Sequence, residues 1–308
     1  MLTSFRGLTA PLLAGCAFVA TPAFAAETAA DDSLLSEPSA ASVEALPDAA
    51  PAAADNVVDP VVDQASIALA AVERDAYIPT DDQANSVGDE SGFELSGNVA
   101  LVSDYRFRGV SFSDGDFALQ GGIDLGHSSG FYIGTWASSI SGGSPYGELE
   151  LDVYAGWSGD ISDGVTVDVG LLYYIYPTEG ELANLLGVET DYFEPYASIS
   201  TTLGPVGATL GVAYAWDQDS LGGSDNLYIY TDFEAGIPNT PLTLTAHLGY
   251  TDGVFATSGS GESFDWGLGI SAAVGENLSI GFNYVDTEGP SIEDFTDAGF
   301  FVTIGYSM

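Results

Sequence analysis

The last nine residues of the chain alternate between apolar side chains and side chains that are small or polar. The apolar ones occupy every second position and are Phe300, Val302, Ile304, Tyr306 and Met308. Phe301 is the one large apolar residue between them. Because successive side chains of a β-strand point to opposite faces of the sheet, one face of this segment is entirely apolar. The pattern predicts a strand that contacts lipid on one side.

The same period of two recurs in twelve segments after residue 92. They are residues 93–105, 116–125, 131–139, 148–157, 165–176, 191–203, 206–216, 226–237, 242–251, 264–274, 278–286 and 298–308. In segment 131–139, Phe131 and Ile133 compete with Tyr132 and Trp136 for the apolar face. An even number of strands is typical of bacterial single-chain barrels, which have both chain ends on the periplasmic side. The sequence therefore predicts an all-β fold, a transmembrane antiparallel up-and-down β-barrel of about 12 strands.

The connections between these segments alternate in length. The short ones are residues 126–130, 158–164, 204–205, 238–241 and 275–277, and the longer ones include 177–190, 252–263 and 287–297. Short periplasmic turns and longer external loops are typical of outer-membrane barrels. Aromatic residues on the predicted lipid face gather beside the long loops, which indicates an interfacial girdle. The predicted girdle consists of Tyr105, Phe117, Tyr173, Phe193, Tyr214, Trp216, Tyr250, Phe264, Trp266, Tyr284 and Phe300.

Charge and hydropathy exclude several other classes of protein. After the N-terminus, no apolar run reaches the roughly 18 residues that a membrane helix needs. The formal net charge is -41, with 45 acidic residues against four arginines and no lysine. Nucleic acid is excluded as a partner, because almost nothing in the chain could neutralise phosphates. The expected partners are outer-membrane lipid, the barrel-insertion machinery, and small cations or hydrophilic solutes; a homo-oligomer is left open.

The N-terminal residues resemble a secretory signal. Arg6 precedes an apolar stretch over residues 8–20, and Ala23, Phe24 and Ala25 form a small-x-small cleavage site. We therefore predict a signal peptide over residues 1–25 and a cysteine-free mature chain. The alternative is a lipoprotein, because residues 13–16 resemble a lipoprotein box and would leave Cys16 lipidated at the mature N-terminus.

Residues 26–90 are rich in Ala, Asp, Pro and Ser, with 15 acids and one arginine. Such a segment cannot bury enough apolar area to offset its ordering entropy, so we predict a disordered periplasmic arm. Apolar residues between 62 and 76 fall at helical spacing, which leaves open a transient helix or a helix that contacts a partner or plugs the barrel. The barrel itself is predicted over residues 91–308.

The stretch SGNVALVSDYRFRGVSFSDGDFALQGG, residues 96–122, resembles the opening of the TorF-type porin family of Gram-negative bacteria. GFYIGTWASSI (130–140) and ELELDVYAGW (148–157) are similar to its next two blocks, and the run at residues 103–109 is the most specific part. The resemblance covers nearly all of residues 93–308 and implies an outer-membrane β-barrel that acts as a porin, without a settled substrate. The chain differs from the family in its acidic arm and in ending at Met308, where such barrels usually end in an aromatic residue.

Acidic residues gather on the faces opposite the predicted lipid faces, which carry no charge. They are Glu94, Asp104, Asp116, Asp124, Glu148, Glu150, Asp152, Asp168, Glu194, Asp232, Glu234 and Asp265. Arg106 and Arg108, at the outer end of the first strand, are the bases that oppose them. A carboxylate about 7 Å away attracts a monovalent cation by roughly 0.6 kcal/mol in water and roughly 2.4 kcal/mol at an effective dielectric of 20.

Rings of carboxylates select cations in pores, so we predict a cation-preferring channel. Its selectivity is expected mainly in the outer half, at Asp104, Asp116, Glu148, Glu150, Asp152, Glu194 and Asp265. Arg106 and Arg108 are expected to pair with Asp104 and Asp116, and an electrostatic eyelet is the alternative. The acids would equally serve to keep the interior wet, because acids are abundant throughout this chain.

Other chemistry has weak support in the sequence. Glu293 and Asp294 are adjacent in the last external loop, but their spacing does not resemble a calcium loop, and we expect solvated charge. His127 and His247 are the two histidines, and nucleophilic catalysis would need one of them near a serine or threonine. We expect no metal, no cofactor and no enzymatic activity. The leading hypothesis is a passive diffusion porin, and the alternative is a closed structural or adhesive barrel.

Overall fold

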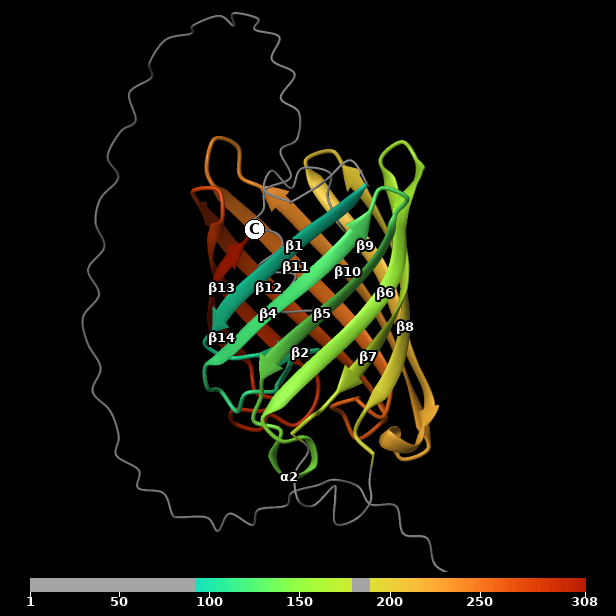
Figure 1. The fold of residues 1–308 in the computed structure, drawn as a ribbon. Helices are drawn as coiled ribbons and strands as arrows, with labels where there is room; N and C mark the ends of the chain where they lie inside the picture. The colour runs from blue at the N-terminus through green and yellow to red at the C-terminus, as the bar shows by residue number, and fades with distance from the viewer. Residues whose placement is uncertain (1–91, 179–188) are drawn as a thin grey trace, which may run out of the picture. The chain divides into compact units, whose positions relative to one another are not determined.

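Twelve long strands form one closed antiparallel barrel (Figure 1). The structure is a computed structural model and describes residues 92–178 and 189–308. The predicted signal peptide, the acidic arm and the alternative lipidation site at Cys16 lie outside these residues. β1 pairs with β14, where Val102 lies opposite Thr303, as well as with β4, and this double pairing closes the sheet. The predicted fold class is confirmed.

The barrel strands lie close to the predicted segments. They are β1 (Phe93–Val102), β4 (Ala118–His127), β5 (Phe131–Ser139), β6 (Leu149–Ser162), β7 (Val165–Ile175), β8 (Tyr192–Leu203), β9 (Val206–Gln218), β10 (Ser224–Gly236), β11 (Leu242–Gly253), β12 (Glu262–Val274), β13 (Leu278–Thr287) and β14 (Gly299–Ser307). Short elements in the connections are β2 (Arg106–Phe107), β3 (Val110–Ser111), the helix α2 (Gly143–Tyr146) and the 3-10 turn η1 (Asp219–Leu221).

Strand boundaries differ from the prediction most clearly in two places. β1 ends at Val102 instead of residue 105, and β4 begins at Ala118 instead of 116, because the chain between them forms a separate hairpin, β2–β3. β6 continues to Ser162 through a register shift, so that the turn predicted over residues 158–164 shortens to Asp163 and Gly164. At the connection between β1 and β4, the predicted alternation continues beyond the backbone pairing. In β6, the backbone pairing continues beyond the predicted alternation.

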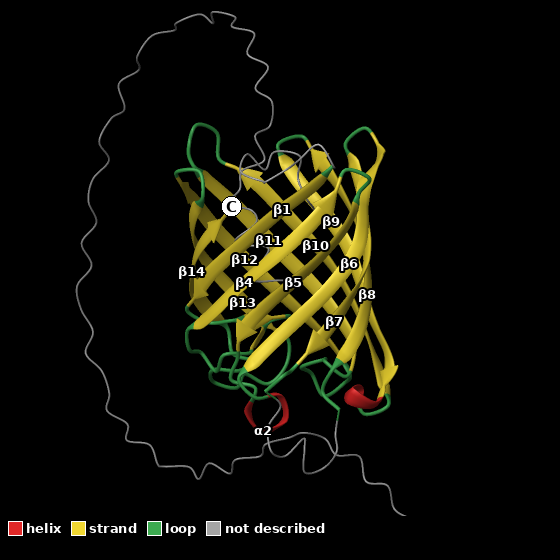
Figure 2. Ribbon diagram, in the orientation of Figure 1, coloured by secondary structure: helices red, strands yellow, loops and turns green. Residues whose placement is uncertain are grey.

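The connections divide the barrel into two different ends. The short turns lie at one end, which we call the short-turn end, together with the start of β1 and the end of β14. The longer connections lie at the other, the long-loop end, at the bottom of Figure 2. The strands run between these ends at an incline to the barrel axis, as closure of a sheet into a barrel requires (Figure 2).

The outer face of the barrel is apolar, and the inner face is mainly polar. In β14, Phe300, Val302 and Ile304 are 67%, 40% and 45% exposed, whereas Phe301 and Thr303 between them are 4% and 1% exposed. The one exception to the alternation at the C-terminus is therefore an interior side chain. A soluble barrel would place its apolar face inside, so this arrangement identifies a transmembrane β-barrel.

The facing of β5, which the sequence left open, is decided by the structure. Phe131 and Ile133 are 64% and 52% exposed on the outer face, and Tyr132 and Trp136 are buried on the inner face. The register with β6 places Trp136 opposite Asp152, which also faces inward. Lipid-side and interior positions on this strand therefore follow the same alternation as on the others.

The aromatic girdle forms on the outer face beside the long-loop end, and its tyrosines are anchored by acids at the rim. Tyr214 donates a hydrogen bond to Asp225 at 2.8 Å, and Tyr284 donates to Asp286 at 3.1 Å. A ring in lipid with its hydroxyl in water is the arrangement that favours tyrosine at a membrane interface. The assignment of Tyr105 to this girdle is wrong, because Tyr105 is 2% exposed and lies inside the barrel.

Neighbouring residues on opposite faces provide a test of the membrane-facing side. Leu210 in β9 is 55% exposed on the outer face, and Thr209 faces inward, within 2.9 Å of the Ser200 hydroxyl. We expect Leu210→Arg to destabilise the barrel folded in lipid vesicles by about 2 kcal/mol or more, because a base within the bilayer is poorly solvated. Thr209→Arg, whose side chain enters the polar interior, is the matched control and should cost clearly less. Urea titration of vesicle-embedded protein measures both, and equal costs would contradict the assignment of faces.

Candidate functional site

The connection between β1 and β4, residues 103–117, folds into the barrel instead of extending outward. Its centre is the hairpin β2–β3, whose two-residue turn is Arg108–Gly109, with φ angles of 49° and 80°. Two positive φ angles match a type I′ turn, in which Asn, Asp or Gly is preferred and arginine is unusual. The left-handed conformation costs Arg108 about 1–2 kcal/mol. We therefore expect the Arg108 side chain to make interactions that offset this cost.

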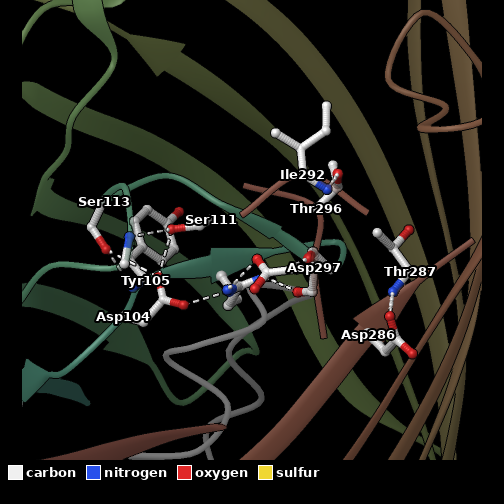
Figure 3. A network of polar contacts seen from close by, with 12 residues as sticks. Asp104, Tyr105, Ser111, Ser113, Asp286, Thr287, Ile292, Thr296 and Asp297 are labelled. Carbon is white, nitrogen blue, oxygen red and sulfur yellow. Dashed lines mark hydrogen bonds and ion pairs between the residues drawn. The ribbon is translucent and has the colours of Figure 1, made fainter. Parts of the chain in front are cut away.

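The base of the hairpin is held by the carboxylate of Asp104 (Figure 3). Asp104 accepts hydrogen bonds from the hydroxyls of Ser111 and Ser113 at 2.6 and 3.2 Å, and from Nε of Arg106 at 2.5 Å. All four side chains are buried. The predicted pairing of Arg106 with Asp104 is confirmed.

Arg106 also ties the hairpin to the last long loop. Its Nη1 donates to the carbonyl of Asp297 at 2.7 Å, and its Nη2 lies 3.5 Å from the Asp297 carboxylate. The guanidinium lies directly over Gly299, where an added Cβ would come within 2.8 Å of Nη2. The backbone N–H of Ser111 donates to the carbonyl of Phe295 in the same loop. Residues 103–117 are thus bound to both the wall and a neighbouring loop.

The tip of the hairpin reaches the far wall of the barrel. Nη2 of Arg108 lies 2.9 Å from Oε2 of Glu194 in β8, and both side chains are buried. Tyr174 in β7 donates its hydroxyl to the same carboxylate oxygen at 3.1 Å. The guanidinium carbon lies 4.7 Å from the ring centre of Phe107 and 4.1 Å from that of Tyr228. Cation–π contacts shielded from water contribute about 2 kcal/mol, enough to offset the strain of the turn.

Aromatic side chains surround the hairpin inside the long-loop half. The edge of the Tyr105 ring packs against Trp136 and Phe112, and its hydroxyl donates to Glu150 at 3.2 Å. Burial raises the pKa of Tyr176, and the negative charge of nearby Glu150 raises it further, so its hydroxyl remains protonated. Gly109 at the tip leaves no room for a side chain, because an added Cβ would lie 2.6 Å from Cβ of Thr287. The hairpin is therefore packed as part of the interior.

Interior tyrosines lie along the barrel wall over glycines of adjacent strands. A Cβ at any of these glycines would collide with the tyrosine, in the pairs Tyr132–Gly156, Tyr154–Gly134, Tyr196–Gly170, Tyr228–Gly249 and Tyr230–Gly211. Their hydroxyls reach acids: Tyr132 donates to Asp168 at 2.8 Å, and Tyr154 donates to Asp124. Buried carboxylates are costly unless they accept hydrogen bonds, so the tyrosines stabilise acids that face the interior.

His247 in β11 belongs to a cluster that the sequence did not indicate. Its Nδ1 lies 2.6 Å from Asp232, and its Nε2 lies 3.0 Å from Asp265 and 2.8 Å from the Tyr228 hydroxyl. Tyr228 also donates to Asp265 at 3.1 Å. The alternation along each strand gave no signal for this cluster, because its members lie on three neighbouring strands, β10, β11 and β12, and meet only through the register between those strands.

The predicted pore residues fall into four groups. Asp104, Glu194 and Asp265 are buried and have Arg106, Arg108 and His247 as their respective partners. Buried wall acids are Asp124, Glu150, Asp152 and Asp168, and less buried acids nearer the short-turn end are Glu94, Asp232 and Glu234. Asp116 and Glu148 are exposed at the long-loop end, and Arg108 pairs with Glu194 instead of Asp116.

In residues 92–178 and 189–308, no helix is long and apolar enough to cross a membrane. The same residues contain no group of three or more acidic, histidine or cysteine side chains placed to hold a metal. Glu293 and Asp294, the weak calcium candidate, are both exposed in the loop before β14.

The fold and the interior define a transmembrane β-barrel whose long-loop half is occupied by an inward-folded hairpin. The model of a family of bacterial proteins of unknown function, named Gcw_chp, matches residues 86–307, and the chain belongs to this family. No protein with a curated description matches the sequence. The resemblance to TorF-type porins stays a prediction.

Solved structures similar to this chain include channels of the outer membrane. The NanC porin is 12% identical, with 70% of this chain and 98% of that chain covered and a TM-score of 0.48. An outer-membrane channel from Pseudomonas putida F1 is 10% identical, with coverages of 75% and 99% and a TM-score of 0.40. OpdK from Pseudomonas aeruginosa is 14% identical, with coverages of 72% and 68% and a TM-score of 0.38.

Trypsin can report on the release of the hairpin, because the chain has no lysine and its four arginines are Arg6, Arg74, Arg106 and Arg108. Cleavage inside the barrel can occur only after the two buried arginines of the hairpin. We expect Asp104→Ala to accelerate this cleavage about tenfold or more, because loss of a buried charged hydrogen-bond partner costs about 1.5–3 kcal/mol. Mass spectrometry of the fragments identifies the cleaved bond.

Asp116→Ala removes a carboxylate that is exposed on the same connection and is the matched control. It should leave the rate of cleavage after Arg106 and Arg108 unchanged. If both variants were cleaved at the wild-type rate, Asp104 would not hold the hairpin in place.

Proposed function

We propose that the protein is a diffusion channel of the Gram-negative outer membrane that conducts small hydrophilic solutes and prefers cations. The observation that carries the proposal is the closed barrel whose apolar side chains face outward while acids and tyrosines face inward. Interior carboxylates require desolvation and partners, a cost that a barrel serving only as an anchor would avoid with an apolar core. A polar interior along the barrel axis suits the passage of hydrated solutes.

The two ends of the barrel suggest its orientation. Short turns and both chain ends face the periplasm in bacterial barrels, so the short-turn end would be periplasmic and the long-loop end external. In this orientation the exported chain would carry its acidic arm, residues 26–90, in the periplasm. The girdle of Tyr214 and Tyr284 would then lie at the outer membrane interface.

Charge in the interior supports a preference for cations. Two arginines oppose the acids of the wall, and each is engaged by a specific carboxylate, Asp104 or Glu194. The other acids give the interior an excess of negative charge, and a few carboxylates at about 7 Å would favour cations over anions about tenfold. We assign the selectivity mainly to Glu148, Glu150 and Asp152 near the long-loop end, and the excess should be screened at high salt.

The hairpin determines when such a channel would conduct. Arg106 and Arg108 are 3% and 7% exposed, so the hairpin β2–β3 occupies the interior at their level. The conformation described here therefore corresponds to a closed state, and conduction would require the hairpin to leave the far wall. The same burial is the observation that favours the second candidate, a permanently closed structural barrel.

Selectivity can be tested by recording single channels in a planar bilayer under a potassium chloride gradient. We expect the triple change Glu148→Gln, Glu150→Gln and Asp152→Asn to shift the reversal potential toward that of anions, because three carboxylates lose their charge. Asp163→Asn, in the turn at the short-turn end, is the control and should leave the potential close to wild type. An unchanged potential in the triple variant would remove these residues from the selectivity assignment.

Gating can be tested with Arg108→Asn, which removes the guanidinium but places a residue that type I′ turns favour at the same position. We expect the open probability to rise about tenfold or more, because the closed state loses a buried ion pair and two ring contacts. Asp114→Asn, at an exposed position with φ of 58° on the same connection, is the control. Folded, heat-modifiable protein that conducts in neither wild type nor the Arg108 variant would support the closed structural barrel instead.

A further inference from the structure

The wall that receives Arg108 is built as a binding site for a guanidinium ion. Glu194 supplies a buried carboxylate, Tyr228 supplies a ring face 4.1 Å from the guanidinium carbon, and both belong to barrel strands. A carboxylate beside an aromatic face is the combination that recognises planar organic cations, since guanidinium both donates hydrogen bonds and stacks. Arg108 itself reaches this site from the tip of a hairpin.

The site is positioned by contacts that do not depend on Arg108. The Tyr228 hydroxyl is held by His247 at 2.8 Å and Asp265 at 3.1 Å. Tyr174 donates to Glu194 and is itself stacked on Tyr192, with ring centres 4.4 Å apart. These groups lie on strands β7, β8, β10, β11 and β12. When the hairpin leaves, the carboxylate and the ring face therefore remain in place.

The conformation of the turn indicates that Arg108 is present for its side chain. A residue with φ of 49° next to Gly109 would be better as Asn or Gly for the backbone alone. Departures from local preference are expected where a functional contact compensates for them. The contact that compensates here is the seating of a guanidinium on Glu194 and Tyr228.

We propose that this wall site binds guanidinium-bearing solutes, for which Arg108 is a built-in competitor. A solute of this class that occupies the site prevents the hairpin from returning, so it promotes its own passage. This consequence for conduction rests on the proposed channel function, whereas the binding site does not. A tethered side chain acts at an effective concentration in the millimolar range, so a free solute should compete poorly in the wild type and bind readily once Arg108 is replaced.

The direct test is chemical rescue of Arg108→Asn with methylguanidinium chloride, using full-length protein in detergent micelles. The temperature of unfolding, followed by loss of heat-modifiable migration, should rise by about 2–4 °C when the probe is well above its dissociation constant. Wild type should need at least tenfold more probe for any rise. N-Methylurea has the same shape without the charge and should have no effect, and sodium chloride controls for ionic strength.

The double variant Arg108→Asn and Glu194→Gln identifies the site. It should lose the response to methylguanidinium, because residue 194 then carries a neutral amide in place of the carboxylate that faces the guanidinium. Arg108→Gly is a second background in which the turn is unstrained, and it should respond as Arg108→Asn does. No rise in either single variant, or an equal rise in the double variant, would overturn the site.

Conduction separates this inference from the channel proposal. In planar bilayers, methylguanidinium at concentrations more than tenfold above those that stabilise Arg108→Asn should raise the open probability of the wild type, and N-methylurea should not. Conducting channels whose opening ignores methylguanidinium would overturn the competition and leave the channel proposal intact. A thermal response without conduction in any variant would support the site and overturn the channel.

Discussion

The rest of the structure depends on closure of the sheet between β1 and β14. An open edge would leave unpaired N–H and C=O groups in lipid, where each costs several kcal/mol, and the pairing of Val102 with Thr303 removes this edge. Closure also gives every strand one face toward lipid and one toward the interior. The period-two alternation of facing is thus a requirement on all twelve strands at once. Phe301 keeps to it although it is apolar, because its side chain packs inside the barrel.

The second constraint is the cost of placing carboxylates in a confined interior. The barrel meets it with hydroxyl donors on the wall, such as Tyr132 for Asp168, and with cations brought in by the hairpin for Asp104 and Glu194. Glycines beside these tyrosines allow the rings to lie along the wall, where bulkier neighbours would push them into the lumen. The same side chains that make the interior polar therefore also determine how much of it is filled.

Most of the barrel was predictable from local pattern. The twelve strands, their alternation and the unequal connections followed from the spacing of apolar residues, because a strand facing lipid tolerates no other spacing. Tyr105 shows where this argument fails. Its spacing continues the apolar face of β1, but the chain turns inward after Val102, and nothing in the alternation of residues 93–105 marks that turn. Glu194 was missed as the partner of Arg108 for the same reason, because the inward turn after Val102 is what brings Arg108 to β8.

The sequence by itself determined that this chain forms a transmembrane barrel with an acidic interior, since facing and charge depend on residue type and on a period of two. Only the tertiary structure decided that residues 103–117 enter the barrel, that Arg108 meets Glu194 eighty-six positions later, and that His247 joins Asp232 and Asp265. These contacts form across the lumen or between neighbouring strands. Their distances depend on the curvature and register of the closed sheet, which no local pattern of residues encodes.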